Sequence, residues 1–277
     1  MKTPIFLFGS GRCGSTLVQR AINAHPDIVM YGEHEGFLGP IANSYHKLMK
    51  TADVDRFIYG KNALPADLIH GPLKDIGRDI CWINNFTRED VLREHRALVL
   101  NLLARDLDLD KIHWGFKEIR YREGHHVLWF LREIFTECRF VFLIRNPVDT
   151  IVSGLLAWKH ADEAMQDAKR LARIVEKFFG EWTAKYSYLL SHAEAHPEHS
   201  YLMRYEDLIV DPKQHMEHIF GLLKLECPLL ALEIFDRKVA STASEPGRDE
   251  LLEFVRSCRD RADNEGFRQL VSRYRYA

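Results

Sequence analysis

Residues 4–17, PIFLFGSGRCGSTL, join a short apolar run directly to a glycine-rich loop. The run PIFLFG is continuously apolar and ends in glycine, which is typical of a strand buried in a parallel sheet. Residues 15–24 are predicted to form the next helix, closed by a turn at Ala24-His25-Pro26. The glycines let the backbone turn tightly, and the helix N-terminus directs free N–H groups at an anion. The stretch therefore predicts an α/β fold with an anion site between its first strand and first helix.

The loop shares part of its spacing with the nucleotide P-loop, GxxxxGK[ST], because Gly9 and Gly14 match the two glycines of that pattern. Ser15 stands where the P-loop lysine would be, and a cation comes earlier, as Arg12. In ATPases and GTPases that lysine reaches the phosphates and the next hydroxyl holds magnesium, so its absence argues against ATP or GTP hydrolysis. By itself the loop leaves two interpretations open: a phosphate site, or a glycine-rich turn with a solvated arginine.

Four more segments are predicted as strands, and they alternate with predicted helices. The strands are 28–31, 113–119, 139–145 and 200–205. The helices are 36–50, 88–107, 124–136 and 162–195, with two more starting at Asn146-Pro147 and Asp211-Pro212. This alternation favours a three-layer α/β sandwich, in which a central parallel sheet of about five strands has helices on both faces. Residues 1–277 are predicted to form a single domain with an irregular insertion at about 51–86.

The composition narrows the kinds of partner and cofactor. A net charge of −2 provides no global field toward nucleic acid or an anionic membrane. The five cysteines form no CxxC pair and the histidines show no ligand spacing, so we expect neither a disulfide framework nor a metal site. No apolar run reaches the roughly 18 residues of a membrane span, and no signal peptide is evident. The sequence thus predicts a cytoplasmic protein with no membrane span and no nucleic-acid partner.

Two motifs together resemble those of the sulfotransferases that use PAPS (3′-phosphoadenosine-5′-phosphosulfate). Residues 8–17, FGSGRCGSTL, resemble their 5′-phosphosulfate loop, and residues 145–154, RNPVDTIVSG, resemble their 3′-phosphate motif, an arginine followed eight residues later by a serine. Arg145 would leave a strand at its C-terminal end, where open α/β sheets bind ligands, and arginine can hold a phosphate through two parallel hydrogen bonds. Taken singly, Arg145 also fits an ordinary ion pair and Ser153 an ordinary helix serine.

Two further segments fit the same family. Residues 204–212, RYEDLIVDP, resemble a YEDL…DP segment whose tyrosine lies near the adenine, so Tyr205 is a candidate purine contact or else a core tyrosine. Residues 114–117, WGFK, resemble a strand motif whose lysine, here Lys117, points at the sulfonate. Arg12 in the loop and Glu33 after the second strand look more like the tyrosylprotein and bacterial carbohydrate or lipid sulfotransferases than the cytosolic small-molecule ones. In the former, a glutamate at this place is the base.

The resemblance implies a P-loop-like fold and in-line transfer of a sulfonate from PAPS to an acceptor hydroxyl, releasing PAP and requiring no metal. It implies Glu33 as the base and Arg12 and Lys117 as catalytic cations. The implied donor contacts are Arg12, Cys13, Gly14, Ser15, Thr16, Leu17, Arg145, Ser153 and Tyr205. A C-terminal segment at about 236–277 would cover the nucleotide, with Ser241 and Arg248 as candidate contacts.

Several alternatives stay open. The chain would also fit a P-loop nucleotide kinase or NTPase that needs magnesium, or a non-catalytic nucleotide-binding protein. Glu33 would also fit a structural role at the start of the helix near Gly36. The acceptor, a hydroxyl of a peptide tyrosine, a carbohydrate, or a lipid or small molecule, is left open, as is a homodimer built on residues 162–195. Candidate acceptor-site walls are Trp82, Phe86, Trp158 and His160.

Overall fold

The computed structural model describes residues 1–51, 86–157, 167–236, 247–259 and 264–276. Its central sheet has five strands, all parallel, in the order β2-β3-β1-β4-β5. The strands are β1 (Ile5–Gly9), β2 (Ile28–Tyr31), β3 (His113–Glu118), β4 (Arg139–Ile144) and β5 (Ser200–Arg204). The predicted fold class is therefore confirmed. The last three strands each end one residue before the predicted end.

Strand β1 lies at the centre of the sheet, between β3 and β4, and all of its residues are buried. Ile5 pairs with Gly115 of β3 on one side and with Arg139 of β4 on the other. A Cβ atom at Gly115 would collide with the carbonyl oxygen of Ile5. The glycine of the predicted WGFK strand is thus required for β3 to approach β1 closely.

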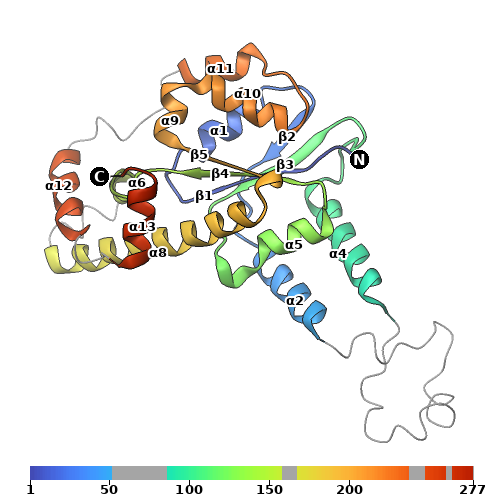
Figure 1. Cartoon of the computed structure of the whole chain (residues 1–277), viewed down its shortest axis with the longest axis horizontal. Helices are drawn as coiled ribbons and strands as arrows, with labels where there is room; N and C mark the ends of the chain where they lie inside the picture. The colour runs from blue at the N-terminus through green and yellow to red at the C-terminus, as the bar shows by residue number, and fades with distance from the viewer. Residues whose placement is uncertain (52–85, 158–166, 237–246, 260–263, 277) are drawn as a thin grey trace, which may run out of the picture. The chain divides into compact units, whose positions relative to one another are not determined.

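Helices cover both faces of the sheet (Figure 1). On one face, α1 (Ser15–Ile22), α10 (Pro212–Leu222) and α11 (Leu229–Asp236) share a core with Ile5 and Leu7 of β1. On the other face lies the long helix α8 (Ala168–Ala195), where the Phe140 ring of β4 contacts the His192 ring, with their centroids 4.9 Å apart. Successive strand residues point to opposite faces, so one continuous apolar strand supplies both cores.

The starts of three helices follow from local capping. Asn146 accepts hydrogen bonds from the amides of Val148 (2.9 Å) and Asp149 (3.4 Å) at the start of α6 (Pro147–Ala157), as predicted. Asp211 accepts from the amide of Gln214 (3.0 Å) at the start of α10, again as predicted. For α8 the described helix begins at Ala168, with Asp167 as its cap, and residues 162–166 of the predicted helix lie outside the described residues.

The chain divides into two compact units: residues 1–36, 106–123 and 137–277, and residues 37–105 and 124–136. The second contains α2 (Leu38–Lys50), α4 (Arg88–Leu103) and α5 (Val127–Ile134), which contribute to a cluster of rings around Tyr45. The predicted insertion at 51–86 lies, apart from its two ends, outside the described residues. The single-domain organisation stays a prediction.

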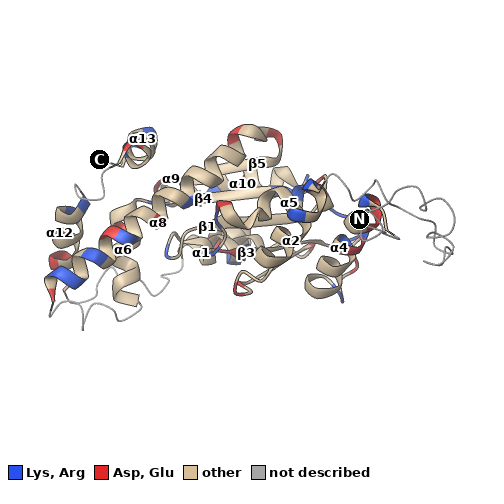
Figure 2. Ribbon diagram, turned by 90° about the horizontal axis from the view of Figure 1, so that it is seen from below, with Lys and Arg blue, Asp and Glu red and all other residues tan. Residues whose placement is uncertain are grey.

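The remaining elements of the first unit are α9 (Tyr205–Val210), α12 (Arg248–Arg259), α13 (Glu265–Arg273) and the short 3₁₀ turn η4 (Pro197–His199). A second 3₁₀ turn, η3 (Glu123–His125), starts in the first unit and ends in the second. Acidic and basic residues both occur along α8 and α12 (Figure 2). Among the described residues, none of the helices is long and apolar enough to span a membrane.

Candidate functional site

The loop between β1 and α1 has a backbone that needs glycine at its end. Arg12 and Gly14 both have positive φ, 65° and 97°. A Cβ atom added at Gly14 would lie 2.5 Å from two ring carbons of Tyr205, so both the backbone angle and the available space require glycine there. The start of the loop is tied to α8, because the amide of Ser10 donates to the Tyr186 hydroxyl (3.0 Å). That hydroxyl donates in turn to the carbonyl of Leu143 in β4 (2.8 Å).

The backbone amides of the loop differ in whether they have a hydrogen-bond partner. The amides of Cys13 and Leu17 donate within the loop, to the carbonyls of Ser10 (3.4 Å) and Gly14 (3.0 Å). Those of Gly14 and Thr16 hydrogen-bond to no residue that the structure describes. Free amides at the start of α1 are the groups by which helix N-termini bind anions.

Residues from four separate segments meet beside this loop. Arg145, which follows β4, donates from Nη1 to the carbonyl of Arg12 (2.9 Å), and its guanidinium lies 4.5 Å from the ring centre of Tyr205. Arg12 donates from Nε to the Ser153 hydroxyl on α6 (3.2 Å). The indole of Trp182 on α8 donates to the Arg145 carbonyl (3.2 Å). Two arginines thus lie together at the C-terminal ends of β1, β4 and β5, where open α/β sheets bind ligands.

A carboxylate and a lysine lie on the other side of the loop. Nζ of Lys117, in β3, contacts Oε1 of Glu33 and lies 3.4 Å from the hydroxyl of Thr16. The Lys117 side chain is only 6% exposed, whereas Glu33 is 27% exposed. Glu33 makes these contacts instead of capping a helix, and α2 starts later, at Leu38. Glu33 therefore does not cap the helix near Gly36, and its role as the base stays a prediction.

Arg120 and Glu118 were missed in the sequence, although both lie just after the WGFK motif. Arg120 binds Oε2 of Glu33 (2.8 Å), Oε1 of Glu35 (2.8 Å) and Oε1 of Glu118 (2.9 Å). Glu118 has a fully buried side chain and accepts from the amides of His34 (3.2 Å) and Gly36 (2.9 Å). Glu118 therefore fixes the backbone on both sides of Glu33 and holds one of its two cationic partners.

These contacts determine the charge of Glu118. Burial raises its pKa, but hydrogen bonds from the Arg120 guanidinium and from the amides of Ile119, His34 and Gly36 outweigh burial, and the pKa is lowered overall. His34 shows the opposite balance, because burial lowers its pKa more than the neighbouring Glu118 raises it. These shifts favour an ionised Glu118 carboxylate beside a neutral His34 imidazole at neutral pH.

A small cavity of about 110 Å³ adjoins the loop, lined by Ser10 and Gly11 and by residues of α6 and α8. The residues of α6 include Ile151 and Gly154, and those of α8 include Trp182 and Lys185. Lys185 donates to the carbonyl of Ile119 at the end of β3, and burial lowers its pKa. The cavity walls are more apolar than polar, so a small apolar group would suit it better than an anion.

Comparison with known proteins assigns this chain to a family. The profile of the sulfotransferase family matches residues 4–228, which include the loop, Glu33, Lys117, Arg145, Ser153 and Tyr205. The chain belongs to the sulfotransferase family. A search of curated proteins found no match for this sulfotransferase.

Solved structures show the same fold. The sulfotransferase domain from the Synechococcus PCC 7002 olefin synthase superposes with a TM-score of 0.55 at 16% identity, over 100% of this chain and 97% of that one. The sulfotransferase domain from the curacin biosynthetic pathway gives a TM-score of 0.50 at 15% identity, over 100% and 99%. At these identities the likeness concerns the fold alone.

The structure also shows the surroundings of three more predicted residues of this sulfotransferase, whose roles at the donor stay predictions. Cys13 is buried, and burial raises the pKa of its thiol, so the side chain is not a ready nucleophile. Tyr205 packs against both Arg145 and Gly14, which makes it a support of the loop. Arg248 pairs with Asp149 (3.3 Å). The candidates Ser241, Trp82, Trp158 and His160 lie outside the described residues.

Proposed function

We propose that this sulfotransferase moves a sulfonate from PAPS to an acceptor hydroxyl, with the loop of residues 10–16 as the centre of the donor site. The observation that carries the proposal is the meeting of Arg145, Arg12 and Ser153 beside the amides of Gly14 and Thr16, which bond to no residue in the described part of the chain. PAPS carries a 5′-phosphosulfate and a separate 3′-phosphate, so its site needs two groups of anion-binding donors. The amides with Arg12 suit the first group, and Arg145 with Ser153 suits the second.

In the proposed reaction the acceptor oxygen attacks sulfur and forms a new S–O bond. The bond between sulfur and the bridging oxygen of the 5′-phosphate breaks, and that phosphate leaves with the electron pair as part of PAP. Glu33 takes the acceptor proton, a role worth about 10²–10⁴-fold in rate. Arg12 and Lys117 stabilise the charge that develops on the sulfonate and the leaving phosphate.

The contacts of Glu33 suggest how its role is prepared. Both of its carboxylate oxygens are engaged, one by Lys117 and the other by Arg120. For Glu33 to accept a proton, one partner must give way to the acceptor hydroxyl. Lys117 is the partner that also lies beside Thr16 in the loop, so we propose that it turns from Glu33 toward the sulfonate, while Arg120 keeps the carboxylate in place.

A direct test is calorimetric titration of the wild-type protein with PAP and, separately, with ATP and magnesium, followed by a sulfonate-transfer assay with labelled PAPS. The proposal expects binding of PAP that is unchanged by a metal chelator. Binding of ATP only with magnesium would instead favour a kinase or NTPase. Binding of PAP without transfer to any hydroxyl acceptor of a broad panel would favour the non-catalytic nucleotide-binding protein.

A further inference from the structure

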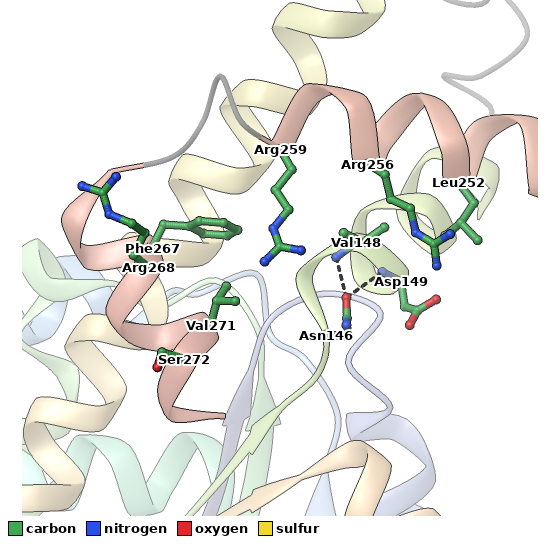
Figure 3. A pocket seen from close by; sticks show the side chains of 10 residues that line it. All are labelled: Asn146, Val148, Asp149, Leu252, Arg256, Arg259, Phe267, Arg268, Val271 and Ser272. Atoms are coloured by element: carbon green, nitrogen blue, oxygen red, sulfur yellow. Dashed lines mark hydrogen bonds between the residues drawn. The ribbon is translucent and has the colours of Figure 1, made fainter. Parts of the chain in front are cut away.

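A second cavity lies away from the loop, between α6 and the two C-terminal helices α12 and α13 (Figure 3). Its volume is about 710 Å³, which falls within the usual range of small-molecule sites, about 300–1,000 Å³. Asn146, Val148 and Asp149 form the wall from α6 and the residue before it. The walls from α12 and α13 lie beyond residue 228, where the match to the family profile ends.

Arginine dominates the charge of this cavity. Arg256 and Arg259 of α12 and Arg268 of α13 line it, against the single acid Asp149. Asp149 is already paired with Arg248, at 3.3 Å. Among the residues that line the cavity, three arginines therefore stand against one carboxylate that is already paired. An anion is therefore the ligand that the electrostatics of the cavity favour.

The geometry holds part of this charge in place. Arg259 donates from Nη2 to the carbonyl of Tyr276 (3.2 Å), and its guanidinium lies 6.0 Å from the ring centre of Phe267. Figure 3 shows Arg259 reaching between α12 and α13, with Arg256 on the same helix pointing toward Asp149 and Arg268 pointing away from both. Arg256 and Arg259 are three residues apart and thus share one side of α12. A guanidinium has five N–H donors, so Arg259 keeps several for a ligand after its bond to Tyr276.

Four of the lining residues are apolar, beside the polar Asn146 and Ser272. The side chains of Phe267 and Val271 are buried in α13, and Leu252 and Val148 face them from α12 and α6. These apolar side chains lie in the same cavity as the guanidinium groups that would hold an anion. They would also contact an apolar or aromatic group attached to that anion. The cavity therefore combines two cations for a doubly charged group with apolar surface for its substituent.

The cavity is separate from the proposed donor contacts. The Arg145 side chain points to the Arg12 carbonyl and Tyr205, and neither it nor Ser153 lines the cavity. The first amides of α6 are not its anion-binding groups, because Asn146 already accepts from Val148 and Asp149. We therefore infer that the cavity between α6, α12 and α13 is a second anion site, which binds a phosphomonoester carried on an apolar or aromatic body through Arg256 and Arg259.

Phenyl phosphate is the probe for this inference, titrated by calorimetry in a phosphate-free buffer, first without PAP and then with saturating PAP. We expect one molecule to bind the wild-type protein, and roughly tenfold or greater weakening in Arg256→Ala and in Arg259→Gln, since a hydrogen bond to a charged group contributes about 1.5–3 kcal/mol. Arg173→Ala, which removes an exposed arginine of α8 outside the cavity, is the matched control and should bind like wild type. Inorganic phosphate should bind more weakly than phenyl phosphate, because it lacks the apolar body.

Three results would overturn the inference: no binding to wild type, unchanged binding in both α12 variants, or displacement of phenyl phosphate by PAP. The last would make the cavity part of the donor site. If PAP does not bind the wild-type protein, phenyl phosphate is titrated into Arg145→Ala and Arg256→Ala. Phenyl phosphate binding that is lost in Arg145→Ala but kept in Arg256→Ala would place the phosphate at the proposed donor site and would also contradict the inference. Thermal unfolding checks that Arg259→Gln is folded, and Arg256 is exposed, so its truncation should leave the fold intact.

Discussion

The guanidinium of Arg145 lies 4.5 Å from the ring centre of Tyr205, and the same ring would block any side chain at Gly14. One aromatic ring thus links the residue after β4 to the last turn of the β1–α1 loop. Nη1 of Arg145 completes the link through its bond to the Arg12 carbonyl (2.9 Å). The proposed 3′-phosphate contact and the proposed phosphosulfate loop are therefore one connected structure, and a change in either should affect the other.

Arg145→Ala should weaken PAP binding by roughly tenfold to a hundredfold, because it removes a charged donor and releases the Arg12 carbonyl. The fold should survive, since Trp182 bonds to the backbone carbonyl of residue 145, which the substitution keeps. Calorimetric titration with PAP measures the effect, and Arg173→Ala on the exposed face of α8 is the control. Equal PAP affinity in the variant and the wild type would remove Arg145 from the donor site.

Gly14→Ala should destabilise the protein and weaken PAP binding together. The backbone has φ 97° there, and the new methyl group would lie 2.5 Å from carbons of the Tyr205 ring. An alanine forced into positive φ costs about 1–2 kcal/mol before any collision is counted. The matched control is Gly180→Ala in α8, where a Cβ meets nothing within 4 Å and alanine should stabilise the helix by up to about 1 kcal/mol. Urea unfolding of both variants gives the free energies, and a stable Gly14→Ala protein with normal PAP affinity would contradict the proposed loop geometry.

Glu33→Gln should lower the rate of sulfonate transfer by about 10²-fold or more while PAP still binds, because glutamine keeps the shape of the side chain but cannot take a proton. Glu35→Gln is the control from the same segment. Glu35 also pairs with Arg120 but is 84% exposed, and it makes no contact with Lys117. The measurement is transfer from labelled PAPS at saturating donor. Full activity in Glu33→Gln, or an equal loss in Glu35→Gln, would exclude Glu33 as the base.

Glu118→Gln should lower the free energy of unfolding at pH 7 by about 1–3 kcal/mol, since it leaves a hydrogen-bonded arginine without its carboxylate. The pKa of Glu118 lies below its ordinary value of 4.5 in the folded protein. Its contribution to stability is therefore complete above about pH 4.5 and is lost as the pH falls from there toward the folded-state pKa. Urea unfolding of wild type and variant at pH 7 and below pH 4.5 should show the difference shrinking with acid. A difference that stays constant with pH would mean that Glu118 is not the ionised centre of this cluster.

The same variant tests whether Glu118 positions Glu33. Because Glu118 binds the amides on both sides of Glu33 and the side chain of Arg120, its loss should reduce the transfer rate more than it weakens PAP binding. Glu118→Asp keeps a carboxylate on a shorter side chain, which cannot reach all of the same hydrogen-bond donors. Its sulfonate-transfer rate should therefore stay below that of the wild type. An unchanged rate at pH 7 in Glu118→Gln would show that the cluster is purely structural.

The sequence by itself determined the features that depend on a few neighbouring residues. The apolar runs at 5–9 and 139–144 became buried parallel strands, and Asn146 and Asp211 became the helix caps that their residue types predict. Apolar pattern, glycine spacing and capping all act within one or two turns of the chain, so they can be read without a partner segment. The same local signals identified the loop before α1 and the strand-end Arg145.

Only the tertiary structure decided which of these residues touch. The pairing of Glu33 with Lys117 and Arg120 spans more than eighty residues and requires β2 to lie beside β3, which no local pattern specifies. The burial of Glu118 likewise depends on donors brought from the segment after β2. Side-chain partners follow from strand order and from the packing of helices on the two faces of the sheet. The charge of Glu118, the contact of Arg12 with Ser153 and the arginine cavity of α12 and α13 therefore became visible only in the folded chain.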